Sequence, residues 1–195
     1  MKLRDSQRQQ TRAAILDALA EVIVESGGFG FSVQEVADRA GLTHRTVYNH
    51  FPTREALSEG LAAHVEEQLA TNGPPPDATL SLERLVPMVD EIYRGFEARE
   101  THVRAYVMLM VWSRGPAKVA RNRSSAFEAL IEREAALRPP VTARQLSAAV
   151  RMFVSSTGWH VLTEHLGLSS KEAAATATWA TQTLLDAATN GGSTG

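Results

Sequence analysis

Cysteine is absent from the 195 residues of this chain. That absence excludes disulfide bonds, thiol nucleophiles and thiolate metal sites, and it is compatible with a reducing cytoplasm. Long hydrophobic runs are also missing: the longest, Tyr106 to Trp112, is far shorter than the roughly 20 residues that a membrane helix needs. The opening segment, MKLRDSQRQQTR, lacks the apolar stretch of a secretory signal. We therefore expect a cytoplasmic protein without a membrane partner.

Catalytic motifs are missing as well. The sequence has no G-x-S-x-G, no H-E-x-x-H and no P-loop. The glycines at 27, 28 and 30 follow no strand pattern, and no lysine comes after them at phosphate-binding distance. His160 and Glu164 are spaced to share a metal ion, but His165 points elsewhere and a third ligand is missing, so a solvated pair is the simpler interpretation. The sequence thus predicts no enzyme: no catalytic residue, no metal ion and no cofactor.

Positive charge is concentrated in two short segments. The formal net charge is −2, which by itself argues against a nucleic-acid partner, but a DNA contact surface needs only local positive charge. Residues 1–12 contain one acid, Asp5, and residues 44–55 contain one acid, Glu55. The basic residues and histidines are Lys2, Arg4, Arg8 and Arg12 in the first segment and His44, Arg45, His50 and Arg54 in the second.

Apolar residues recur at helical spacing along almost the whole chain, and no segment alternates as a strand does. We therefore predict an all-α fold of about nine helices, with Ser32 and Thr43 as N-caps of two short ones. Consecutive prolines within 71–81 cannot lie inside a helix, so they separate an N-terminal domain, residues 1–70, from a C-terminal domain, residues 80–190. Helices are expected at about 11–26, 32–41, 43–52, 53–70, 82–99, 101–113, 116–137, 142–166 and 169–188.

Residues 33–51, VQEVADRAGLTHRTVYNHF, have the spacing of two short helices joined by a tight turn. Ala37 permits close approach of the second helix, Gly41 accepts the backbone conformation of the turn, and Val47 faces the small core. Burying these residues leaves the other side of the second helix free to enter a major groove of DNA. That exposed side consists of His44, Arg45, Thr46, Tyr48, Asn49 and His50.

The chemistry of this exposed side suits DNA. Arg45 can pair bidentately with a guanine edge and Asn49 with an adenine edge. Taken singly, Arg45, Tyr48 or Asn49 is better interpreted as an ordinary solvated side chain. The whole set favours DNA binding, because residues compatible with DNA occupy nearly the entire exposed side.

The segment FSVQEVADRAGLTHRTVYNHFPTREAL resembles the signature of the TetR family of transcriptional regulators. The resemblance implies a three-helix DNA-binding domain, joined by a linker helix to a helical domain that binds a ligand and dimerises. It implies phosphate contacts from Ser32 and Arg54, although lysine is commoner than arginine at the second position. The DNA-facing helix would then present Thr43, His44, Arg45, Thr46, Tyr48, Asn49 and His50.

The resemblance further implies a homodimer, formed through the last two helices, that binds a palindromic operator. The apolar faces of 142–166 and 169–188 fit that role, but they fit burial within one chain equally well. A small apolar or aromatic effector would release a repressor from its operator by shifting the linker helix at 53–70. A transcriptional activator, or a helical ligand-binding or interaction protein without DNA binding, remains the alternative. The best candidates for effector contact are Tyr106, Met110, Trp112 and Trp159, although such residues more often form core.

Overall fold

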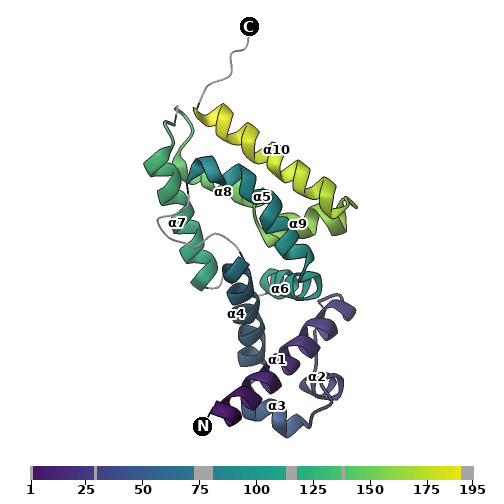
Figure 1. Cartoon of the computed structure of the whole chain (residues 1–195). Helices are drawn as coiled ribbons and strands as arrows, with labels where there is room; N and C mark the ends of the chain where they lie inside the picture. The colour runs from purple at the N-terminus through teal and green to yellow at the C-terminus, as the bar shows by residue number, and fades with distance from the viewer. Residues whose placement is uncertain (1, 29, 73–80, 113–117, 138, 190–195) are drawn as a thin grey trace. The chain divides into compact units, whose positions relative to one another are not determined.

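The computed structural model describes residues 2–28, 30–72, 81–112, 118–137 and 139–189, without the side chains of 2, 3, 70–72, 111, 112 and 118–124. Throughout these ranges the chain forms ten α-helices and one π-helix, with no strand, so the all-α prediction is confirmed. None of these helices combines the length and the apolar character needed to cross a membrane. The helices form two compact units, described in turn below (Figure 1).

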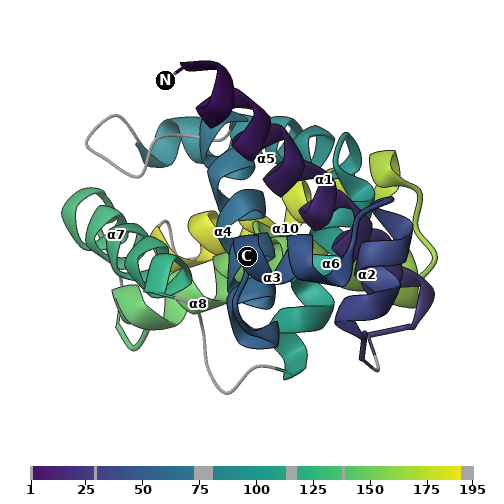
Figure 2. The same cartoon turned by 90° about the horizontal axis from the view of Figure 1, so that it is seen from below.

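The first unit comprises Met1–Gln68 and Arg99–Gly115. In it α1 packs against both α6 and α2, and α2 packs against α3. Buried side chains from all of these helices form its core; Ile15 and Leu19 of α1 and Val47 of α3 have no exposed surface. Figure 2 looks onto the side of this unit where α3 lies. Its helices are α1 (Lys2–Glu25), α2 (Val33–Arg39), α3 (His44–His50), most of α4 (Arg54–Asn72) and α6 (Glu100–Trp112).

Helix α1 begins at Lys2, whereas the apolar periodicity predicts a helix only from Thr11. The extra turns contain arginine, lysine and glutamine, which have high helix propensity but no apolar periodicity. The basic segment is therefore helical, and Arg4, Arg8 and Arg12, four residues apart, lie along one side of it.

The second unit comprises Leu69–Ala98 and Pro116–Gly195. In it α10 packs along α5 and α8, and α7 packs against α8 (Figure 1). Leu85, Ile131, Leu146, Val150 and Leu185 belong to its buried apolar cluster, which joins these four helices. The helices of this unit are α5 (Leu82–Glu97), α7 (Lys118–Glu134), α8 (Ala143–Phe153), α9 (Ser156–His160), η1 (Val161–His165) and α10 (Ser170–Thr189).

The single helix predicted for 142–166 is wrong, because the chain leaves the helical conformation at Val154 and Ser155. The Ser155 hydroxyl accepts from the Gly158 amide at 3.1 Å and so starts α9. The backbone carbonyl of Met152 lies so close to Gly158 that no side chain fits there. The sequence suggests that the small residues Ser155, Ser156 and Gly158 allow close packing between two helices. In the structure they permit a sharp break within the predicted helix.

Helix α6 groups with the first unit, because it packs against α1. The predicted division into a DNA-binding domain, 1–70, and an effector domain, 80–190, is a division of function, and it stays a prediction.

Candidate nucleic-acid interface

Helix α3 is held by its own cap and by one buried residue. The Thr43 side chain accepts a hydrogen bond from the Thr46 amide at 3.2 Å, as an N-cap does. Gly41 has a φ of 65°, the left-handed conformation that the turn before the helix requires. Val47 is fully buried, Thr46 and His50 are half-buried, and His44, Arg45, Tyr48 and Asn49 are exposed. The predicted helix-turn-helix geometry is confirmed in these details.

Helix α2 begins with a complete capping box. The Ser32 hydroxyl accepts from the Glu35 amide at 3.1 Å, and the Ser32 amide donates to the Glu35 carboxylate at 2.7 Å. Hydrogen bonds from the Ser32 amide first and from its hydroxyl second hold the pKa of the Glu35 carboxyl below its ordinary value.

The outward side of α3 is open. The rings of His44 and Tyr48 pack edge to face with centroids 4.6 Å apart. Arg45 and Asn49, also one helical turn apart, are both exposed. Within the described part of the chain neither forms an ion pair or a side-chain hydrogen bond. Arg45 and Asn49 form an exposed ridge on α3. This ridge can therefore form hydrogen bonds with a base edge without first breaking a hydrogen bond within the described part of the protein.

Basic residues of α1 and α4 lie near the end of α3. Burial lowers the pKa of His50, and the positive charges of Arg8 and Arg12 of α1 lower it further, because these two arginines lie near the ring. The Arg12 guanidinium stacks over the Phe51 ring, 4.2 Å from its centroid. At the start of α4, the Arg54 guanidinium stacks in the same way over Phe31, at 4.5 Å. These stacked arginines combine restrained positions with net positive charge, which suits contacts to a phosphate backbone.

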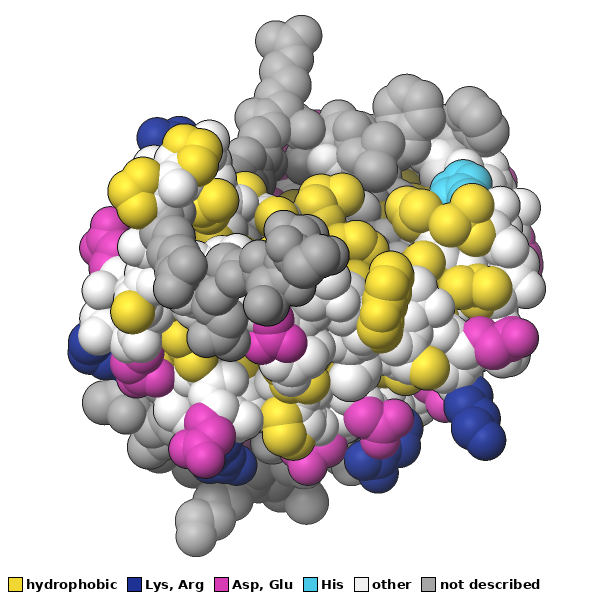
Figure 3. Space-filling view, turned by 90° about the horizontal axis from the view of Figure 1, so that it is seen from above, with side chains coloured by type: hydrophobic (Ala, Val, Ile, Leu, Met, Phe, Trp, Pro, Cys, Tyr) yellow, Lys and Arg dark blue, Asp and Glu magenta, His cyan; other side chains and the backbone are white. Residues whose placement is uncertain are grey.

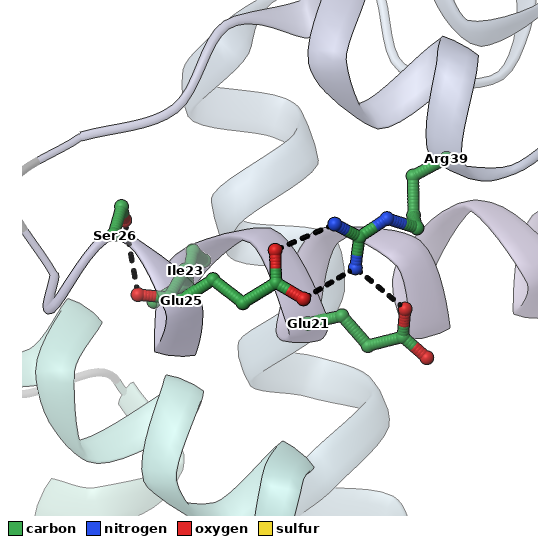
Figure 4. Close-up of polar contacts among 5 residues, drawn as sticks. All are labelled: Glu21, Ile23, Glu25, Ser26 and Arg39. Atoms are coloured by element: carbon green, nitrogen blue, oxygen red, sulfur yellow. Dashed lines mark hydrogen bonds and ion pairs between the residues drawn. The ribbon is translucent and has the colours of Figure 1, made fainter.

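Arg39 joins α2 to the last turns of α1 (Figure 4). Its guanidinium donates to Glu25 at 2.8 Å and 2.5 Å and to Glu21 at 3.0 Å. The hydrogen bond from Arg39 is the main cause that holds the pKa of Glu25 below its ordinary value, and the two carboxylates raise the pKa of Arg39. Arg39 is thus engaged within the protein and orients the helix-turn-helix.

The predicted effector contacts fall in different units. Tyr106 and Met110 lie on α6 in the first unit, where the Tyr106 hydroxyl donates to the buried carboxylate of Glu66 at 2.9 Å. Trp159 lies on α9 in the second unit, with its ring 6.0 Å from that of Phe96. The side chain of Trp112 lies outside the described residues. The pairing of these residues in one pocket stays a prediction.

The sequence interpretation placed Val161 on an apolar face but missed three other exposed apolar residues of the second unit, Met152, Leu166 and Trp179. Trp179 of α10 is 69% exposed and Leu166, after η1, is 64% exposed. Met152 and Val161 are exposed too, and hydrophobic side chains gather on the side where α10 lies (Figure 3). The sequence pattern could have indicated the exposure of Trp179. Ala173, Ala177 and Ala180 form a buried stripe along α10, and Trp179 lies off that stripe.

Comparisons with known proteins agree on the helix-turn-helix. Residues 15–61 match the model of the tetR family of bacterial regulatory proteins. The nucleoid occlusion factor SlmA of Alteromonas mediterranea is 37% identical over 60 residues, 31% of each chain. The HTH-type transcriptional regulator AlkX of Mycobacterium tuberculosis is 28% identical over 68 residues, 35% of this chain and 32% of that relative. The chain thus matches about a third of the length of these curated relatives.

Among solved structures the similarity extends over most of the chain. NalD, the secondary repressor of the MexAB-OprM multidrug efflux pump in Pseudomonas aeruginosa, has a TM-score of 0.63 at 24% identity, covering 91% of this chain and 97% of NalD. The TetR family regulator PfmR of Thermus thermophilus has a TM-score of 0.62 at 17% identity, covering 88% and 96%. At such identities the likeness establishes the fold.

Proposed function

Because this chain is a member of the tetR family of bacterial regulatory proteins, we propose that it is a ligand-responsive repressor that binds a palindromic operator as a homodimer. The family is one of DNA-binding regulators rather than enzymes. The cytoplasm, where the DNA lies, is the proposed location.

The open ridge of α3 is the observation that carries the DNA-binding proposal. Arg45 and Asn49 have the side chains that pair best with guanine and adenine, and both are exposed on adjacent turns. Thr43, His44, Thr46, Tyr48 and His50 flank them, and Ser32 and Arg54 are the proposed phosphate contacts. Arg8 and Arg12 add positive charge beside His50.

Dimerisation is proposed through the exposed apolar residues of the second unit. Trp179, Leu166, Met152 and Val161 lie on or beside the two segments predicted to dimerise. Exposed large apolar side chains on neighbouring elements are typical of protein interfaces. Leu146, Val150 and Leu185 are already buried within the chain and are therefore not proposed as contacts.

Trp159 supports a proposed effector site in the second unit. Its side chain is 2% exposed, and among the described residues its indole N–H has no hydrogen-bond partner. An unsatisfied buried donor costs about 1–3 kcal/mol. An aromatic effector that carries a hydrogen-bond acceptor, such as a carboxylate or phenol oxygen, would remove this cost. Tyr106, Met110 and Trp112 are the proposed effector contacts on α6.

A Trp159→Phe variant tests this effector proposal, because it keeps an aromatic ring and removes the N–H. We expect apolar aromatic acids, screened by thermal shift, to stabilise the wild-type chain and to stabilise the variant less. A neutral hydrocarbon of similar size serves as the control ligand, and it should not distinguish the two chains. Equal shifts for the acids in both chains would count against the indole as a ligand contact.

Activation of transcription remains the alternative to repression, because the same complex of the protein with DNA can produce either effect at a promoter. Two curated relatives that match a similar share of this chain have different names, a nucleoid occlusion factor and a transcriptional regulator. Similarity at this level therefore supports DNA binding and leaves its consequence to experiment.

Selection from random double-stranded DNA tests the proposal. We expect enrichment of a palindromic site whose affinity falls with added salt. Arg45→Ala should lose about 1–3 kcal/mol of binding and relax specificity at one base pair per half-site. Arg144→Ala, an exposed arginine of α8, is the control and should bind as the wild type does. If no site is enriched even at low salt, the protein is a helical binding module without DNA binding.

A further inference from the structure

Three polar side chains from three helices meet within the first unit. Asp17 lies on α1, His64 on α4 and His102 on α6. One potential ligand atom from each lies within 4.8 Å of the other two. Such clusters of two histidines and a carboxylate are the donor sets that transition metals use in proteins.

The contacts within this cluster already hold the side chains close together. His102 Nε2 lies 2.9 Å from Asp17 Oδ1, and the two imidazole rings have centroids 6.0 Å apart. Gln68, one turn after His64, forms a hydrogen bond with its Nε2 at 2.8 Å and restrains that ring. A hydrogen bond between His102 and Asp17 explains the first contact but not why the His64 ring lies beside it.

The dimensions suit a small ion. Bonds of about 2.0–2.1 Å from zinc to nitrogen or oxygen place tetrahedral ligand atoms about 3.3 Å apart. The 2.9 Å contact is close to that spacing, and side-chain rotation can bring the third atom inward from at most 4.8 Å. His102 and Asp17 are 22% and 55% exposed, so an ion and a water ligand can reach them from solvent.

The donor atoms select the class of ion. Two imidazole nitrogens and one carboxylate favour zinc, nickel or copper over magnesium and calcium, which prefer oxygen ligands. We propose that Asp17, His64 and His102 bind one divalent transition-metal ion of the zinc type, with water in the remaining position. The ion would replace the hydrogen bond between Asp17 and His102 and would join α1 to α4 and α6, beside the hydrogen bond from Tyr106 to Glu66 that already links α6 to α4.

Titration of zinc chloride into the EDTA-treated 195-residue chain tests the site, with the heat of binding as the readout. A parallel titration with cobalt chloride, followed by its visible spectrum, reports the coordination of the ion. We expect one ion per chain. The affinity for zinc should fall at least tenfold in each of the variants His64→Ala, His102→Ala and Asp17→Asn. Loss of even an outer-shell partner of a metal site lowers metal affinity by about 10–100-fold. His165→Ala is the matched control: it removes a histidine of the second unit that contacts another histidine ring, His160, at 5.5 Å.

Stabilisation by zinc gives a second readout that is insensitive to an altered fold. The rise in melting temperature on adding zinc is measured within each variant, so a lower starting stability does not affect it. His64→Gln replaces His64→Ala if the alanine variant does not fold. No binding in the wild type, or equal zinc affinity in the wild type and in His64→Ala and His102→Ala, overturns the proposal. Binding lost only in His165→Ala assigns the ion to the second unit and overturns it as well.

An effect of zinc on operator affinity rests on the proposed function, whereas zinc binding itself does not. Anisotropy of a labelled operator, measured with and without zinc, separates the two. A chain that binds zinc but no DNA contradicts the proposed function alone, and one that binds DNA but no zinc contradicts the metal site alone.

Discussion

At the scale of single residues, Gly60 decides how closely α4 approaches the end of α3. A Cβ atom at this position would overlap the ring of Phe51, which follows α3 directly. Phe51 is 3% exposed and lies beneath the Arg12 guanidinium, so its ring has little freedom to move aside. The absence of a side chain at position 60 therefore helps to fix the end of α3.

Gly60→Ala is expected to destabilise the protein by about 1–3 kcal/mol, the usual cost of overpacking. This cost outweighs the gain of up to about 1 kcal/mol that alanine brings to a helix. Urea unfolding measures the change. Gly95→Ala in α5 is the control, because among the described residues no atom apart from the neighbouring backbone of α5 lies within 4 Å of its added Cβ, and it should be neutral or stabilising. An equal gain in stability from Gly60→Ala and from Gly95→Ala would contradict the overlap between a Cβ at position 60 and the Phe51 ring.

At the scale of elements, the helix-turn-helix depends on the ionic contact of Arg39 with Glu21 and Glu25. The contact links the end of α2 to the end of α1 in the first unit (Figure 4). Arg39 keeps the pKa of Glu25 below its ordinary 4.5. A carboxylate with a lowered pKa stabilises the fold above its unfolded pKa, and this contribution is lost as the pH falls through the lower, folded value.

Arg39→Met, which keeps the apolar stem, should therefore be less stable than the wild type at neutral pH. The difference should shrink as the pH falls below 4.5, where Glu25 becomes protonated in the unfolded and then in the folded chain. Thermal unfolding across this range measures it. Arg94→Met is the control, because its partner, Asp90, lies within the same helix and both are exposed. A difference that stays constant with pH would exclude the ionic contact as its cause.

At the scale of the whole molecule, the exposed apolar residues of the second unit predict self-association. Trp179→Asp places a charge at the most exposed of these residues and should shift the protein from twice its 21.2 kDa chain mass to a monomer. Size-exclusion chromatography with light scattering measures the mass. Tyr48→Ala removes the exposed aromatic residue of α3 and should leave the dimer intact while weakening DNA binding. A Trp179→Asp chain that remains dimeric would place the interface elsewhere.

Local interactions explain what the sequence alone determined. The caps at Ser32 and Thr43, the turn at Gly41 and the burial of Val47 each depend on residues close along the chain. Such interactions leave periodic and capping patterns that can be recognised without a tertiary structure. The all-α class, the helix-turn-helix and the exposure of His44, Arg45, Tyr48 and Asn49 were therefore predictable, whereas Thr46 and His50 are half-buried.

Only the tertiary structure decided the features that depend on contacts between distant segments. Periodicity could not reveal the break at Val154 and Ser155, because it depends on a backbone approach at Gly158. Nor could it reveal the meeting of Asp17, His64 and His102, which no local pattern links. The exposure of Trp179 likewise follows from which face of α10 the other helices cover. Sequence spacing defines each helix face, but packing decides which face is buried.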